Sequence, residues 1–79
     1  MQITFNDLTY YKDLYDEALE KFLANKTLGT IAQRDDALNR FIKIGRVYYK
    51  NNRLSYKDIM QLYIRDKKVF DDTNKPKTK

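Results

Sequence analysis

Residues 30–50 read TIAQRDDALNRFIKIGRVYYK, and this stretch decides the fold. Gly45 lies in the middle of its apolar side, where a missing side chain lets another helix approach closely. Thr30 and Gln33 have the spacing of a capping box, so a helix is expected over about residues 30–50. The apolar side chains recur every three or four residues, as on one side of a helix: Ile31, Ala37, Leu38, Phe41, Ile42, Ile44, Tyr48 and Tyr49.

Two further helices flank this stretch, at about residues 5–25 and 56–71. Each repeats apolar side chains with the helical period. Each also begins with a capping box, in which the N-cap residue and the residue three positions later bond each other's backbone. The two pairs are Thr4 with Asp7 and Ser55 with Asp58.

These three amphipathic helices predict an all-α fold, a small three-helix bundle. No period-2 pattern of a β-strand competes with them. At 79 residues the chain has room for one domain, which we expect to span residues 1–72. Residues 73–79 are polar and rich in lysine, which is typical of a disordered tail.

Charge is divided unevenly along the chain, whose formal net charge is +5. Residues 1–29 carry three basic and five acidic side chains, whereas residues 30–79 carry 13 basic and six acidic ones. The first helix is therefore expected to have an acidic outer side, and the other two helices basic outer sides. Such a division bears on what the protein attracts and not on its fold.

The basic outer sides make nucleic acid, and duplex DNA in particular, the first expected partner, because Lys and Arg neutralise phosphates. A small accessory or regulatory DNA-binding protein, of the kind that phages and plasmids encode, is the preferred interpretation, with a homodimer as one option. The alternative is that these charges only keep the domain soluble. We expect DNA phosphates to be contacted through one basic face, formed by a basic stripe on the second helix and another on the third. The candidate nucleic-acid-binding residues are Arg40, Lys43, Arg46, Lys50, Lys57, Arg65 and Lys68.

A helix-turn-helix can be fitted to the sequence in two ways. In the first, the second and third helices flank a turn at residues 51–54, and Lys57, Asp58 and Gln61 lead the recognition helix. In the second, residues 28–45 are themselves the motif, and Asn39, Arg40 and Lys43 face the groove. Asp36 then occupies the position where the motif usually has a glycine. Neither fit is close enough to assign the family.

The alternative function is a protein-binding module, such as an inhibitor, adaptor or immunity-type protein. Seven tyrosines and four phenylalanines exceed what so small a core needs, and exposed aromatic side chains are enriched at binding hot spots. Tyr10 and Tyr49 each belong to an adjacent pair, of which only one member can be central to the core. These two residues are the candidate protein interface. Burial of both rings is the competing interpretation.

The composition argues against several other functions. The chain has no His and no Cys, so the usual catalytic base, the thiol nucleophile and the common zinc ligands are absent. We therefore expect no enzyme, no catalytic residue, no metal and no cofactor. No apolar stretch approaches the length of a membrane span, and no signal peptide is visible, so a cytoplasmic protein without a membrane partner is expected.

Overall fold

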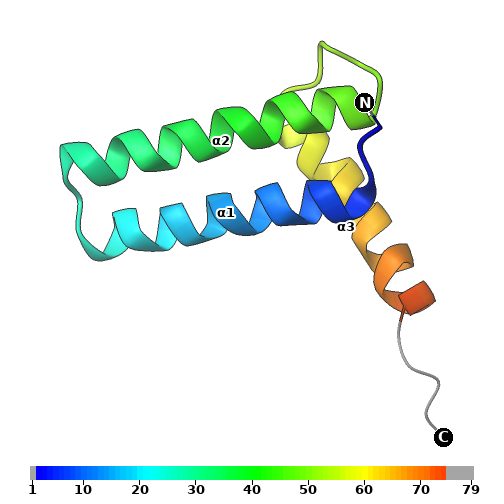
Figure 1. Cartoon of the computed structure of the whole chain (residues 1–79), viewed down its shortest axis with the longest axis horizontal. Helices are drawn as coiled ribbons and strands as arrows, with labels where there is room; N and C mark the ends of the chain where they lie inside the picture. The colour runs from blue at the N-terminus through cyan, green and yellow to red at the C-terminus, as the bar shows by residue number, and fades with distance from the viewer. Residues whose placement is uncertain (1, 75–79) are drawn as a thin grey trace, which may run out of the picture.

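The structure, a computed structural model, describes residues 2–74 and contains the three expected helices (Figure 1). They are α1 (Phe5–Ala24), α2 (Leu28–Tyr48) and α3 (Tyr56–Asn74). No strand occurs in this part of the chain. The predicted all-α three-helix bundle is therefore confirmed.

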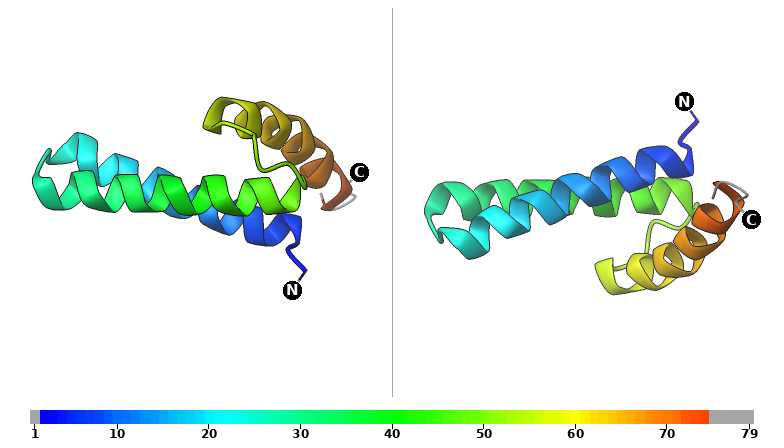
Figure 2. Two further views of the ribbon diagram at one scale, coloured as in Figure 1. Left: turned by 90° about the horizontal axis from the view of Figure 1, so that it is seen from above. Right: turned by 90° about the horizontal axis from the view of Figure 1, so that it is seen from below.

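α1 and α2 form an antiparallel hairpin, and α3 crosses one end of it (Figure 1). That end is where α1 begins and α2 ends. Both views in Figure 2 place α3 on one side of the hairpin. Within the described residues, no third helix lies against the opposite end (Figure 1). Among the described residues, no helix combines the length and the apolar character that crossing a bilayer requires.

The capping boxes at the start of α1 and α3 are confirmed. The Asp7 N–H donates to the Thr4 hydroxyl at 3.3 Å, and the Thr4 N–H donates to the Asp7 carboxylate at 3.0 Å. Ser55 and Asp58 exchange the same two bonds, each at 3.2 Å. Each box pairs backbone N–H groups that a helix start leaves without a partner.

The predicted start of α2 is wrong, because Thr27 caps this helix in place of Thr30. The Thr30 N–H donates to the Thr27 hydroxyl at 3.1 Å, and the Thr27 N–H donates to the Thr30 hydroxyl at 2.9 Å. The Thr30 hydroxyl also donates to the Asn25 carbonyl at 2.7 Å, which joins α2 to the end of α1. Thr30 is thus the third residue of the helix, and the expected box with Gln33 does not form.

The ends of α2 and α3 also differ from the prediction. α2 ends at Tyr48 and not at residue 50, whereas α3 continues past residue 71 to Asn74. Thr73 and Asn74 are therefore helical, although we expected them in the tail, whose other residues, 75–79, lie outside the described residues. Since α2 is unbroken from Leu28, the helix-turn-helix within residues 28–45 is wrong.

The core lies where the three helices meet. Leu8 of α1, Phe41 of α2 and Ile59 of α3 have no exposed surface, and Tyr63 is 6% exposed. A Cβ atom added to Gly45 would lie 2.8 Å from Ile59 Cγ2, closer than side chains tolerate. The glycine therefore allows the close approach of α3 to α2, as the sequence predicts.

Aromatic rings connect α1 to α3. The Phe5 ring stacks on that of Tyr63 with 5.4 Å between centroids, and it lies 5.1 Å from the ring of Phe70. Further along α1, the Tyr15 ring meets Tyr56 edge-on at 5.7 Å. Aromatic pairs at these distances add about 0.5–1.5 kcal/mol each to the burial of their surfaces. Much of the aromatic surplus is thus used inside the domain.

Candidate nucleic-acid interface

The C-terminal half of α2 and the turn after it form a surface without acidic side chains. Between Asp36 and Asp58 the sequence has six basic residues and no acidic one. The structure gathers four of the six around two adjoining hollows that share Arg46, Val47 and Asn52. We call this the α2 basic surface, and it consists of Asn39, Lys43, Arg46, Val47, Lys50, Asn51, Asn52 and Arg53.

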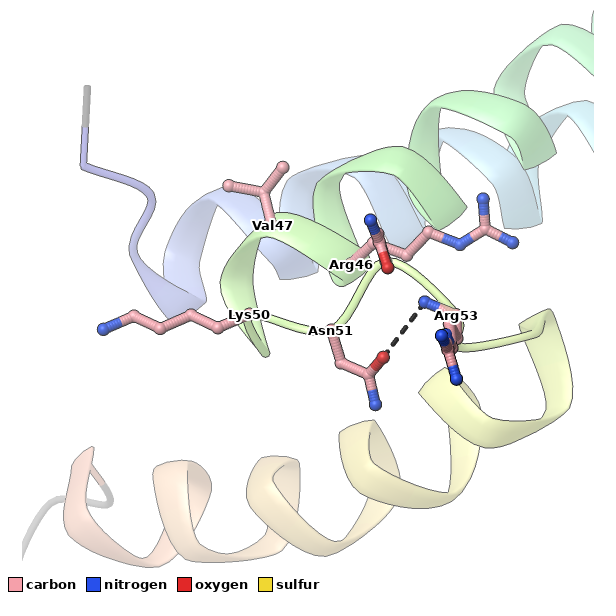
Figure 3. Close-up of a pocket in the computed structure, with 6 residues that line it drawn as sticks. Arg46, Val47, Lys50, Asn51 and Arg53 are labelled. Atoms are coloured by element: carbon pink, nitrogen blue, oxygen red, sulfur yellow. Dashed lines mark hydrogen bonds between the residues drawn. The ribbon is translucent and has the colours of Figure 1, made fainter.

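The end of α2 builds part of this surface (Figure 3). Lys50 follows the C-cap Tyr49 and has a left-handed backbone, with φ of 55°. Its N–H donates to the Val47 carbonyl at 3.2 Å, and the Asn51 N–H donates to the Arg46 carbonyl at 3.0 Å. These two bonds define a Schellman motif, in which glycine usually occupies the left-handed position. Here a lysine occupies it.

Two further hydrogen bonds order the turn. The Arg46 Nε donates to the Leu54 carbonyl at 2.7 Å, so this half-buried side chain ties the turn to α2. The Arg53 N–H donates to the Asn51 side-chain oxygen at 3.0 Å, as the dashed line in Figure 3 marks. Arg46 therefore positions the surface as well as adding charge to it.

The basic candidates differ in whether an acidic side chain pairs with them. Arg40 forms an ion pair with Asp36 at 3.0 Å, and Arg65 forms one with Asp66 at 2.9 Å. Within residues 2–74, no carboxylate pairs with the exposed side chains of Lys43, Lys50, Arg53, Lys57 and Lys68. The first three of these belong to the α2 basic surface, which therefore keeps its positive charge.

The structure does not bring the two predicted basic stripes onto one face. Lys57 and Lys68 lie on the opposite side of α3 from Ile59, at about 100° per residue. Since Ile59 packs against Gly45, these two lysines point away from α2. α3 also lies to one side of the hairpin (Figure 2). The stripe on α3 is thus a second surface, separate from the α2 basic surface.

The remaining helix-turn-helix fit, with α2 and α3 around the turn, finds little support in the side chains. Asp58, which would lead the recognition helix with Lys57 and Gln61, caps α3 instead. Its carboxylate would also meet the phosphates of DNA with the same sign of charge. This fit therefore has no advantage over α2 as the helix that contacts a polyanion.

Tyr49 is not the exposed anchor that a protein interface needs. Its side chain is half-buried, and its hydroxyl donates to Asp66 at 2.8 Å, which links α2 to α3. Burial raises the pKa of Tyr49, and the hydrogen bond from Arg65 lowers the pKa of Asp66. Tyr10 is different, since it is 60% exposed with its ring edge-on to that of Tyr11.

The acidic outer side of α1 is present, and part of its charge is paired. Lys12 bonds Asp16 at 2.6 Å, and Lys21 lies 4.0 Å from Glu17. In the described part of the chain, no group of three or more acidic side chains is arranged to hold a metal ion. The exposed acidic residues of this side are Asp13, Asp16, Glu17 and Glu20.

Sequence reasoning missed Val47, Asn51, Asn52 and Arg53 of the α2 basic surface. It reached Asn39 only through the helix-turn-helix fit at residues 28–45, which is wrong. Helical spacing defines the predicted basic stripe of the second helix, and it leaves out the residues of the turn. The absence of acidic residues between Asp36 and Asp58 is a sequence signal that does include the residues of the turn. Comparison with protein-family models, with curated proteins and with solved structures finds no match to this chain.

Proposed function

We propose that this protein binds duplex DNA, without catalysing a reaction, through the α2 basic surface. One observation carries the proposal: Lys43, Lys50 and Arg53 line two adjoining hollows, and no carboxylate within residues 2–74 pairs with them. DNA carries one negative charge for about each 1.7 Å of helix axis, so neighbouring cations can meet successive phosphates. An accessory or regulatory role is the kind of function that such binding serves.

The placement of α2 supports the proposal. α1 and α3 pack against its inner sides, which leaves its outer side as an edge of the molecule (Figures 1 and 2). An α-helix is about 10–12 Å across with its side chains, and the major groove of DNA is about 12 Å wide. The outer side of α2 can therefore enter the groove while the turn after it meets a phosphate strand.

The test compares two triple variants with the same change in charge. The first is Lys43→Gln, Lys50→Gln and Arg53→Gln, on the α2 basic surface. The second is the control, Lys21→Gln, Lys57→Gln and Lys68→Gln, on α1 and α3. Fluorescence anisotropy of a labelled duplex, measured over a range of salt concentrations, gives the affinity and its salt dependence.

The slope of log K against log salt is negative, and each lost phosphate contact reduces its magnitude by about 0.9. We therefore expect the first triple to reduce the magnitude of the slope by about 2 to 3, and the control to leave it nearly unchanged. An equal loss in the control would contradict the proposed surface. Wild-type protein that fails to bind the duplex even at low salt would overturn the proposal.

A second candidate function, protein binding, is favoured by the outer side of α1. Tyr10 is 60% exposed and Leu14 is 36% exposed, and residues four apart are neighbours on a helix. A protein partner there would lose about 2 kcal/mol or more of binding free energy on Tyr10→Ala, because exposed tyrosines are frequent hot spots. Its binding would depend weakly on salt, which distinguishes it from DNA binding.

A further inference from the structure

We infer that the α2 basic surface reads DNA sequence, with Asn39, Lys43 and Val47 against base edges in the major groove. This inference rests on the proposed DNA binding and adds a specificity to it. It separates the side chains that hold phosphates from the side chains that distinguish base pairs.

The three side chains form a line along the outer side of α2. They are four residues apart, a spacing that places them one above the other on a helix. All three border the same hollow, together with Arg46 and Asn52. At about 1.5 Å per residue the line is about 12 Å long. It therefore spans between three and four base pairs, which are spaced by about 3.4 Å.

Each residue of the line matches the chemistry of a base edge. An asparagine amide can bond the N6 and N7 atoms of adenine, and a lysine can bond O6 and N7 of guanine. A valine can contact the methyl group of thymine. Within residues 2–74, no hydrogen-bond or ion-pair partner engages the side chains of Asn39 and Lys43.

Val47 distinguishes base reading from simple phosphate binding. It is 51% exposed in the middle of a basic surface, where an apolar side chain adds nothing to the attraction for phosphates. Asn39, likewise, adds no charge. Lys50 and Arg53 lie beyond the C-terminal end of the line and are placed to hold the backbone. The line and its flanks thus have the two kinds of contact that a specific complex requires.

The experiment begins with selection of bound duplexes from a random pool by the full chain. We expect enrichment of a short motif that contains adenine, guanine and thymine. Anisotropy then compares the enriched duplex with unselected duplex for two double variants. These are Asn39→Ala with Val47→Ala and, as the matched control, Leu28→Ala with Gln33→Ala, which removes one exposed apolar and one exposed amide side chain far from the surface.

The first double variant is expected to lose about tenfold in affinity for the enriched duplex and to keep its affinity for unselected duplex. Replacing thymine by uracil should weaken the wild type about threefold and weaken Val47→Ala less, because that variant has already lost the two methyl groups of Val47 that reach furthest toward the base. Circular dichroism checks that both double variants remain helical.

The possible outcomes distinguish base reading by α2 from the proposed DNA binding on which it rests. Duplex binding without an enriched motif overturns base reading and leaves DNA binding in place. An enriched motif that the first double variant binds as well as the wild type also overturns base reading by these residues. Absence of duplex binding at every salt concentration overturns both.

Discussion

Lys50 combines a disfavoured backbone with a charge in the middle of the α2 basic surface. Its φ of 55° lies in the left-handed region, which costs a residue with a side chain about 1–2 kcal/mol. Glycine, the usual residue at this position of a Schellman motif, avoids that cost. A lysine at such a strained position is consistent with a function for its ammonium group.

Substitution of this lysine should separate stability from binding. Lys50→Gly is expected to raise the free energy of unfolding by about 0.5–1 kcal/mol, because the left-handed strain is removed. The same variant should bind duplex DNA more weakly, and the magnitude of its salt slope should be smaller by about 0.9. Urea denaturation and anisotropy measure the two effects. A stabilised variant with unchanged DNA affinity would show that the side chain has no part in binding.

Tyr49 and Asp66 illustrate how a residue expected on the surface can instead join two helices. Tyr49→Phe removes the hydroxyl that donates to Asp66, and we expect a loss of about 1 kcal/mol at neutral pH. In the folded protein the pKa of Asp66 is lowered below its ordinary 3.8. As the pH falls, the Asp66 carboxylate therefore takes up a proton in the unfolded chain before it does so in the folded protein. The contribution of the charged carboxylate is therefore complete above about pH 5 and is lost as the pH falls further.

This pH dependence is tested by urea denaturation of the wild type and of Tyr49→Phe, at neutral pH and near pH 3. The difference between the two proteins should shrink at the lower pH, as Asp66 takes up its proton. Tyr10→Phe, which removes an exposed hydroxyl without that partner, is the control and should change little at either pH. A difference that stays constant would rule out the charged Asp66 as the cause.

At the scale of the helices, the sequence predicts what local chemistry determines. The capping boxes before α1 and α3 fix where those helices begin, and both are present. The start of α2 escapes prediction because Thr27 and Thr30 can each cap a helix. A glycine such as Gly29 is typical of the connection between two helices, yet Gly29 lies in the first turn of α2. With Thr27 as the N-cap, the Thr30 hydroxyl donates to the Asn25 carbonyl at the end of α1. The spacing of residues in the sequence does not predict this contact between two helices.

The two glycines provide a matched pair of substitutions. Gly45→Ala is expected to lower the free energy of unfolding by about 1–2 kcal/mol, although alanine favours a helix more than glycine does. The added Cβ would lie 2.8 Å from Ile59, which is fully buried and stiff at χ1. Gly29→Ala should instead stabilise by about 0.4–1 kcal/mol, because its Cβ meets only an ordinary contact at 3.7 Å. Thermal or urea unfolding measures both, and a stabilising Gly45→Ala would contradict the close packing of α3 on α2.

At the scale of the molecule, the decisive feature is that α3 covers only one end of the hairpin. Leu23 and Leu28, at the other end, are 61% and 86% exposed. Helical periodicity predicts which residues share a side of one helix, and it says nothing about the direction in which α3 crosses the other two. For that reason the basic stripes of α2 and α3, which the sequence suggests as one face, are separate in the structure.

The distribution of paired and unpaired charges over the whole molecule also favours the α2 basic surface as the binding site. Ion pairs neutralise Arg40 and Arg65, and the unpaired cations of α3 point away from α2. The α2 basic surface combines unpaired cations, amide groups and an exposed apolar side chain, and none of the described acidic residues lines its two hollows. If the protein binds DNA as proposed, this surface and no other should be in contact with it.

Chemical-shift mapping by NMR tests that claim most directly, with the full chain titrated by duplex DNA at physiological salt. We predict that the largest changes fall on backbone amides of residues 39–54, and that the outer sides of α1 and α3 change little. Changes centred on the outer side of α3, or shifts that do not respond to the duplex, would contradict the account.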